Sequence, residues 1–473
     1  MSVLRGLHCG LRRSLSYGSA PVQQSSGASR KRNDRALCAF ILTFALPVEF
    51  DFTFDAGLHS LWRSGIAKRH RASQRETTMK ARLFRLAAES AVAAVLLFAL
   101  GCTQLPAGPS TTAVAPTSLR ATATMHWNDY ARELVTRNSS PQVARIFPYL
   151  TLAQRNAAVL ARQRKSNVDG AVAGASAAVL AFFFPGATQA IDAQLAREIG
   201  ALGANGPRGD FAAGVEIGKR AADDVIAAAK TDRSDLVWSG SVPSTPGTWK
   251  SQAQPPQPPL FARTGELRPF FTTSGSEFRA PPPPALDSEA FRVTIAEVRR
   301  ISDNRTAEQL RIAQYWELVA SPNFPGWWNL TALEAAEAHH LSQEETAEVL
   351  ALMHMAWLDA FSTCADSKFV YWVPRPTQVD PEIRLAIGLP NHPSYPSNHS
   401  CSSSAAARVL DAKFPDQGGH YLALAQEVAM SRIYGGIHYS IDTEAGLEIG
   451  RKVAAKVLAQ GLPPDRVWLP SQE

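Results

Sequence analysis

The sequence predicts an all-α protein, and two observations carry this prediction. Beyond residue 125, apolar residues recur at the three- and four-residue spacing of amphipathic helices, and the two-residue alternation of strands is absent. Pro and Gly interrupt this pattern at 185–186 and 206–207, as expected between helices. The 473 residues are 45% hydrophobic and 19% charged, which excludes intrinsic disorder for most of the chain. We therefore expect a helical bundle.

The expected helices follow from the apolar spacing. They lie at about 126–136, 152–164, 170–184, 188–202, 211–230, 287–301, 307–318, 329–339, 400–412, 421–434 and 441–459. Ser342 and Glu345 form a capping-box pattern that predicts a further, long helix ending near Lys368. The apolar residues expected on its core-facing side are Leu350, Met353, Trp357 and Phe361.

Residues 242–284 differ in composition from the helical segments. They hold 11 of the 32 Pro residues, together with one Trp and four Phe. Because disordered linkers are usually poor in aromatic residues, we expect an irregular but ordered excursion packed on the helices. A flexible interdomain linker is the alternative.

The net charge of +6 originates in the N-terminal segment. Residues 1–78 hold 12 Lys or Arg and 5 Asp or Glu, whereas residues 79–473 hold 36 and 37. A basic surface for nucleic acid is therefore not expected in the rest of the chain. Residues 1–78 do not have the pattern of a folded domain, and we expect a disordered extension or a segment preceding the true start at Met79.

A targeting pattern begins at Met79. Basic residues precede the apolar stretch 91–100, which Gly101 and Cys102 follow. This pattern predicts a signal peptide over 79–101 and resembles a bacterial lipoprotein signal, in which Cys102 would be lipidated. We expect a linker over 102–124 and an exported protein, periplasmic or tethered to the membrane through Cys102 alone. The alternative is a cytoplasmic tail followed by a signal-anchor helix.

Three clusters near the C-terminus concentrate groups that bind anions. They span 368–376, 396–399 and 431–442 and include one Lys, two Arg and two His. Arg offers a planar fork of donors to a charged oxyanion. His399 is expected at the start of a helix, where free N–H groups and the helix dipole favour an anion. Asp442 follows His438 by four residues, so its carboxylate could hold one ring nitrogen and leave the other nucleophilic.

In order and spacing, these clusters resemble the motifs of the type 2 phosphatidic acid phosphatase (PAP2) and vanadium-dependent haloperoxidase superfamily. The motifs are K-x6-R-P, P-S-G-H and S-R-x5-H-x3-D. The resemblance extends to 278–286 and 304–309, as in the bacterial haloperoxidase-like soluble branch, and covers about 125–462. It implies a domain built on four-helix bundles with an anion site in the core.

The resemblance implies the residues that hold phosphate or vanadate. These are Lys368, Arg375 and Arg432, with Ser397 and the backbone N–H of Asn398 completing the site. Asn398 is the one departure, because the superfamily has Gly there. Gly there would allow either a positive φ or a close approach of the backbone to the anion, and Asn is the residue other than Gly that best tolerates the left-handed region.

The resemblance also implies the catalytic residues. His438 would be the nucleophile that forms a phosphohistidine, or the axial ligand of vanadate. His399 would be the general acid for the leaving group, and Asp442 would orient His438. We assign no role to the other histidines, among them His354 and His392, and no spacing suggests a zinc site.

These expectations favour a phosphatase that hydrolyses small phosphomonoesters without a metal or cofactor. The alternative is a haloperoxidase that uses vanadate in the same site. A third possibility is a binding lipoprotein with weakened catalysis, because Asn398 could crowd the anion. Residues 401–404, which follow His399, offer no aromatic residue or His that can be assigned to halide, and this favours the phosphatase.

Two cysteines of the expected domain flank the first two motifs. Cys364 and Cys401 could form a disulfide in an exported protein, and two buried free thiols are the equal alternative.

Overall fold

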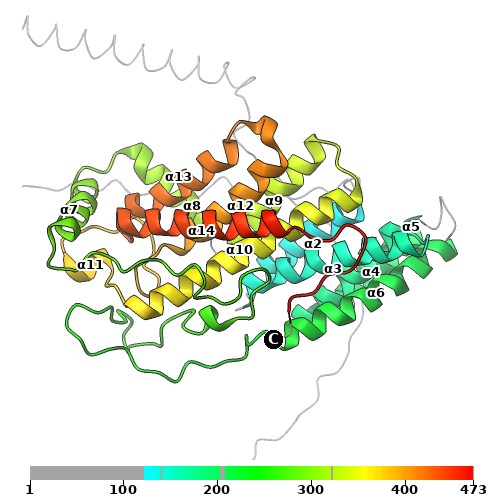
Figure 1. The fold of residues 1–473 in the computed structure, drawn as a ribbon, viewed down its shortest axis with the longest axis horizontal. Helices are drawn as coiled ribbons and strands as arrows, with labels where there is room; N and C mark the ends of the chain where they lie inside the picture. Colours follow the sequence, from blue (N-terminus) through cyan, green and yellow to red (C-terminus); the bar gives the residue numbers. More distant parts are fainter. Residues whose placement is uncertain (1–121, 139, 141, 203–207, 321–322, 472–473) are drawn as a thin grey trace, which may run out of the picture. The chain divides into compact units, whose positions relative to one another are not determined.

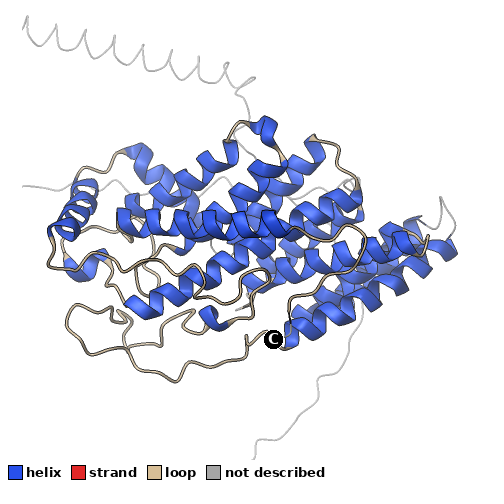
Figure 2. Cartoon of the chain, in the orientation of Figure 1, coloured by secondary structure: helices blue, strands red, loops and turns tan. Residues whose placement is uncertain are grey.

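The chain is helical throughout the part that the structure describes (Figure 2). This computed structural model describes residues 122–138, 140, 142–202, 208–320 and 323–471. Within these residues every regular element is a helix, which confirms the all-α class. The N-terminal extension, the signal peptide, Cys102 and nearly all of the linker lie outside the described residues. None of the described helices combines the length and apolar character needed to cross a membrane.

Five helices form the first half of the described chain. They are α2 (Ala123–Arg137), α3 (Val143–Gln163), α4 (Val168–Phe183), α5 (Thr188–Leu202) and α6 (Arg208–Lys230). The helix α3 starts well before the expected residue 152 and contains Pro148. Proline opposes a helix interior locally, but Ile146 and Phe147 beside it are completely buried, and this packing outweighs the local preference.

The helices α4 and α6 lie side by side (Figure 1), and glycines make their close contact possible. Gly174 of α4 and Gly218 of α6 face the backbone of the opposite helix. A Cβ atom at Gly218 would lie 1.8 Å from the carbonyl oxygen of Ala171, and one at Gly174 would lie 2.3 Å from that of Val215. Only residues without a side chain fit at such a short distance.

The Pro-rich segment that follows α6 is irregular but ordered, as expected. Asp359 of the long helix α10 (Gln343–Tyr371) accepts hydrogen bonds from the backbone N–H groups of Phe270, Phe271 and Thr272 at 2.8, 2.7 and 3.0 Å. Trp249, Phe270 and Phe271 are buried. The segment is thus fixed on the helices by a buried carboxyl group and by its own aromatic residues.

The second half of the chain holds the remaining helices. They are α7 (Glu289–Asp303), α8 (Ala307–Ala320), α9 (Phe324–Ala338), α10 (Gln343–Tyr371), the single turn α11 (Pro376–Val379), α12 (Asn398–Lys413), α13 (His420–Tyr434) and α14 (Ser440–Gln460). The predicted capping box is present at the start of α10, where Ser342 and Glu345 bond reciprocally.

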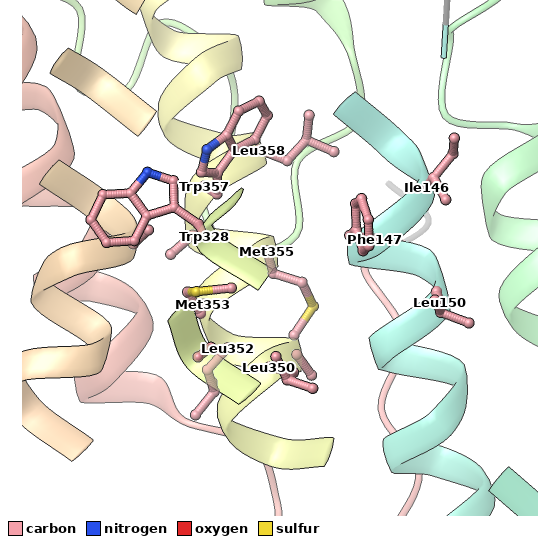
Figure 3. Packing of buried hydrophobic residues seen from close by; sticks show 14 of the residues in the cluster. Ile146, Phe147, Leu150, Trp328, Leu350, Leu352, Met353, Met355, Trp357 and Leu358 are labelled. Atoms are coloured by element: carbon pink, nitrogen blue, oxygen red, sulfur yellow. The ribbon is translucent and has the colours of Figure 1, made fainter. Parts of the chain in front are cut away.

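The long helix α10 lies in the centre and packs against α3, α12 and α14 (Figure 1). Figure 3 shows part of this core, in which Leu350 and Met355 of α10 lie on the side facing Phe147 and Leu150 of α3. All four side chains are fully buried. The end of α10 that carries Lys368 is thereby held against the helices that carry the other two motifs.

The helices α12 and α14 approach closely because α14 carries glycines where the two cross. A Cβ atom at Gly450 would lie 2.4 Å from the carbonyl oxygen of Cys401, and one at Gly446 would lie 2.8 Å from that of Ser397. The facing stretch of α12 is rich in small side chains, with Ser or Ala at 402–407. This contact brings the second and third motifs together.

Candidate active site

The fold brings the three motifs together at one buried site. Lys368 lies in the last turn of α10 and Arg375 caps α11. Arg432 lies in the last turn of α13. Lys368, Arg375 and Arg432 have no exposed surface. Three buried cations beside two histidines form a positive environment suited to an oxyanion.

His438 and Asp442 form the best-defined pair in the site. The His438 Nδ1 lies 2.7 Å from Asp442 Oδ2, and both residues are buried. The pair stands at the start of α14, with His438 just before the helix and Asp442 in its first turn. Asp442 Oδ2 also accepts hydrogen bonds from the hydroxyl of Ser394 at 2.6 Å and the N–H of Tyr439 at 3.2 Å.

The hydrogen bonds assign the tautomer of His438. Its Nε2 lies 3.0 Å from an Nη atom of Arg375, and a guanidinium can only donate. The proton of the neutral ring is therefore on Nδ1, directed at Asp442, and Nε2 carries a lone pair. Burial, with the charges of Arg375 and Lys368, lowers the pKa of His438 well below 6.5 and keeps the ring neutral. Burial also raises the pKa of Asp442 to about 6, so that this carboxyl group is ionised at neutral pH.

Arg375 is held by groups from two segments. It donates to the carbonyl oxygens of His392 at 2.9 Å and Ile437 at 2.7 Å, and its Nη2 lies 3.0 Å from the Nδ1 of His392. His392 is buried, and burial together with the charge of Arg375 lowers its pKa well below 6.5. No role was expected for His392, because it belongs to no motif and is only near the second one in the sequence.

Lys368 contacts a loop in this structure. Its ammonium group donates to the carbonyl oxygens of Pro393 at 2.9 Å and Ser394 at 2.7 Å, and to that of Pro396. These three contacts use all the protons that an ammonium group can donate. Lys368 thus fixes the loop that leads to Ser397, and a contact with an anion would replace one of the carbonyl groups. Burial lowers the pKa of Lys368 to about 8, so it remains mostly charged at neutral pH.

Arg432 is paired with an acidic residue that no motif contains. Its Nη1 lies 3.2 Å from Oε2 of Glu317 in α8, and its Nε lies 3.0 Å from the hydroxyl of Ser431. Arg432 is buried, whereas Glu317 is partly exposed. A bound anion would compete with Glu317 for this guanidinium. Glu317 could not be identified from the sequence, because only the packing of α8 on α13 brings it to the site.

The second motif forms the start of α12. Ser397 is the N-cap residue, and its N–H donates to the carbonyl oxygen of Asp442 at 2.9 Å. Asn398 is the first helical residue and has no positive φ, so of the two possibilities considered for this position the left-handed backbone is not adopted. The first position of a helix needs the ordinary right-handed conformation, and Asn adopts it without strain. The Asn398 side chain is only 7% exposed, and its Oδ1 has no hydrogen-bond partner.

A cavity of about 300 Å³ lies beside Asn398 and His399. Aromatic side chains from three segments form much of its wall, namely Phe261, Phe324, Trp357 and Phe361. The ring centroids of Phe324 and His399 are 4.6 Å apart. Trp357 and Phe361, which we expected to be core residues only, therefore also line the site. Aromatic rings do lie beside His399, although residues 401–404, which closely follow it in the sequence, include none.

Residues 348–462 match the family model of the PAP2 superfamily, and all three motifs lie within them. The chain contains a PAP2 superfamily domain. It is an enzyme of the PAP2/haloperoxidase type, and phosphatase and haloperoxidase activity are not distinguished by this match.

Solved structures of haloperoxidases share the fold of the PAP2 domain and the helices before it. A bacterial vanadium-dependent iodoperoxidase has a TM-score of 0.63 at 22% identity, over 72% of this chain and 95% of that one. The apo form of a bacterial vanadium-dependent chloroperoxidase has a TM-score of 0.55 at 14% identity, over 70% and 98%. The holo form of a bacterial vanadium-dependent chloroperoxidase has a TM-score of 0.51 at 16% identity, over 73% of this chain and 94% of that one. No curated protein matches the chain.

The two cysteines of the PAP2 domain, Cys364 and Cys401, are buried free thiols, so of the two expected alternatives the structure has the free thiols and not the disulfide. The Sγ of Cys364 lies 3.6 Å from the carbonyl oxygen of Pro396, which also accepts from Lys368. Cys364 thus contacts the same loop that Lys368 holds in place.

Proposed function

We propose that this protein is a phosphatase that hydrolyses phosphomonoesters through a phosphohistidine intermediate. The observation that carries the proposal is the state of His438. Its Nδ1 donates to Asp442, its Nε2 carries a lone pair, and the buried guanidinium of Arg375 lies against it. This combination supplies a neutral nucleophile next to positive charge, as an attack on a phosphate dianion requires.

In the first step, the hydrogen bond from Arg375 to Nε2 of His438 breaks, Nε2 attacks phosphorus, and the bond to the leaving oxygen breaks. His399 donates a proton to that oxygen, and the alcohol departs. In the second step, water attacks phosphorus, the P–N bond breaks, and His399 takes a proton from the water. The charge on the phosphoryl oxygens would be stabilised by hydrogen bonds from Arg375, Arg432, Ser397 and the N–H groups at the start of α12.

The proposal includes where the enzyme acts. The targeting pattern at 79–102 supports an exported enzyme, periplasmic or tethered through lipid on Cys102. Its substrate would then be a small phosphoester outside the cytoplasm. Mass determination of the mature N-terminus from cells tests this part by itself.

A vanadate-dependent haloperoxidase is the second candidate, because the chain covers 95% of a bacterial iodoperoxidase and aromatic rings lie beside His399. The residues fit vanadate, a tetrahedral oxyanion like phosphate, which would be held by Lys368, Arg375, Arg432, Ser397 and His438. When bound, vanadate would supply the oxidation of halide by peroxide.

One set of assays on the full chain separates these functions. The phosphatase is supported by hydrolysis of p-nitrophenyl phosphate in the presence of EDTA, inhibited by vanadate and lost in His438→Ala. His420→Ala is the matched control, because His420 is exposed at the start of α13, outside the motifs. A phosphoryl group trapped on His438 by rapid quenching would establish the intermediate. Peroxide-dependent halogenation of a phenol only after vanadate loading would instead favour the haloperoxidase. The absence of both activities in folded protein would favour a binding role.

A further inference from the structure

We propose that the cavity beside His399 binds an aromatic leaving group and that Asn398 recognises a hydrogen-bond donor on it. The substrate class is then the phosphate ester of a phenol or aromatic alcohol that carries such a donor. This inference rests on the proposed phosphatase function and specifies its substrate.

The position of the cavity follows from the role of His399. A general acid must contact the leaving oxygen, so the group attached to that oxygen lies on the His399 side of the phosphate. His399 lines the cavity, and Phe324 packs on its ring. A leaving group that accepts the proton of His399 therefore extends into this space.

The wall of the cavity suits a planar ring. Trp357 and Phe361 stack with centroids 5.3 Å apart and an interplanar angle of 18°, and Phe261 meets Phe361 edge-on at 5.2 Å. Such an arrangement offers both faces and edges to a further ring. The volume of about 300 Å³ is at the lower end of the range for small-ligand pockets. The one carboxylate on the wall, Glu317, is already paired with Arg432, so the wall does not favour a cation.

Asn398 provides the polar contact in this apolar space. Its side chain lines the cavity, is 7% exposed and has no partner for Oδ1. A buried amide oxygen without a hydrogen bond is unfavourable, and a donor on a bound ring would satisfy it. The glycine that the superfamily motif has at this position could not make this contact. The residue thus points to a specificity particular to this chain.

Phe261, which lines the cavity, has a strained backbone conformation. Its φ is +65°, in the left-handed region that is unfavourable for an aromatic residue. The hydrogen bond from the N–H of Leu260 to the carbonyl oxygen of Asn391 holds the loop in place, and the Phe261 ring packs 5.7 Å from that of His392. Phe261 is 40% exposed, so it forms the part of the wall that lies at the surface.

Binding of phosphonates, which are not hydrolysed, tests the cavity without relying on catalysis. By calorimetry on the full chain, phenylphosphonate should bind at least about tenfold more tightly than methylphosphonate. Phe261→Ala should reduce this preference several-fold. Leu260→Ala is the matched control, because Leu260 is also exposed and does not line the cavity, and it should keep the preference. Equal affinities for the two phosphonates in the unmodified protein would overturn the proposal.

A second comparison tests Asn398. The ratio of affinities for 4-hydroxyphenylphosphonate and phenylphosphonate should be about tenfold and should fall towards one in Asn398→Gly. A ratio that Asn398→Gly leaves unchanged would overturn the role of Asn398. Aryl phosphates should also have kcat/KM values at least about tenfold above those of methyl phosphate and choline phosphate. A preference for choline phosphate would overturn the aromatic assignment. Preferential aryl binding without any hydrolysis would instead contradict the phosphatase function and leave the cavity assignment standing.

Discussion

One carboxylate oxygen organises the chemistry of this site. Asp442 Oδ2 receives hydrogen bonds from His438, Ser394 and Tyr439, so it fixes both the ring orientation and the tautomer of His438. A negative charge at this point would also stabilise the positive phosphoimidazole that forms in the first step. The charge and the geometry can be separated by substitution.

Asp442→Asn should lower kcat roughly 10³-fold, because the amide carries no charge and no longer holds the proton of His438 on Nδ1. Ser394→Ala removes one donor to the same oxygen and keeps the charge, so it should cost about tenfold or less. Steady-state kinetics with circular dichroism as a check on folding measures both. Equal losses in the two variants would contradict the role of the charge.

His399 provides a second test at the level of one residue. In the anion-free site, burial and the charges of Arg432 and Arg375 lower its pKa well below 6.5, so the ring is neutral. A general acid must carry a proton, and a bound dianion would raise the pKa of His399. Binding of sulfate, which is already a dianion at pH 6, should therefore be accompanied by the uptake of a proton. Calorimetry in two buffers of different ionisation enthalpy measures this uptake, which should decrease in His399→Ala. The same proton uptake in His399→Ala would show that His399 is not the group that gains the proton.

At the level of the elements, the crossing of α12 and α14 determines the site. Gly446 and Gly450 leave room for the backbone of α12, and Ser397 then donates to the carbonyl oxygen of Asp442. The second and third motifs meet only because these helices are this close. Small residues at the contact are thus a requirement of the catalytic geometry as well as of packing.

Gly450→Ala should destabilise the protein by roughly 1–3 kcal/mol, because its Cβ would lie 2.4 Å from the carbonyl oxygen of Cys401. Activity should fall as well, since α12 must shift away from Asp442. Gly200→Ala in α5 is the matched control, because no atom lies within 4 Å of the added Cβ. It should stabilise the protein by up to about 1 kcal/mol through helix propensity. Calorimetric unfolding measures both, and similar Tm values for the two variants would contradict the close-contact argument.

At the level of the whole molecule, buried titratable groups make stability depend on pH. Burial lowers the pKa values of four histidines, to about 3 in one case and well below 6.5 in the others: His354, His392, His399 and His438. They are neutral in the folded state and become protonated near 6.5 in the unfolded chain. Their contribution to the free energy of unfolding is therefore fully present above pH 6.5 and is lost as the pH falls below it. Asp359 and Asp442, whose pKa values burial raises to about 6, act in the opposite direction.

The Tm should therefore fall when the pH is lowered from 7 to 5. In this range four histidines take up protons on unfolding, whereas two carboxyl groups release them, so the unfolded state binds more protons. The stabilisation by Asp359 and Asp442 is fully present below about pH 3.8 and is lost as the pH rises through 6. It therefore offsets only part of the stability that the four histidines lose towards pH 5. Calorimetric scans at three pH values test this, and a Tm that rises towards pH 5 would contradict it.

Local signals in the sequence were sufficient for most of the fold and for the residues of the three motifs. The helical spacing, the capping box at Ser342 and the order of the motifs each depend on residues near one another in the chain. The start of α3 could not be predicted, because Pro148 opposes it locally and only core packing supports it. Glu317, His392 and Phe324 could not be assigned to the site, since each reaches it through contacts between segments distant in sequence.

The sequence by itself determined the all-α class, the excursion rich in Pro and the residues of the three motifs that meet at the candidate site, because local spacing, composition and motifs encode these features. The tertiary structure alone decided how the site is arranged. It assigned the proton of His438 through Asp442 and Arg375, directed Lys368 to a loop and left Cys364 and Cys401 as free thiols. It also placed an aromatic cavity beside Asn398. Hydrogen-bond geometry and burial depend on which residues meet in space, and no local pattern in the chain specifies that.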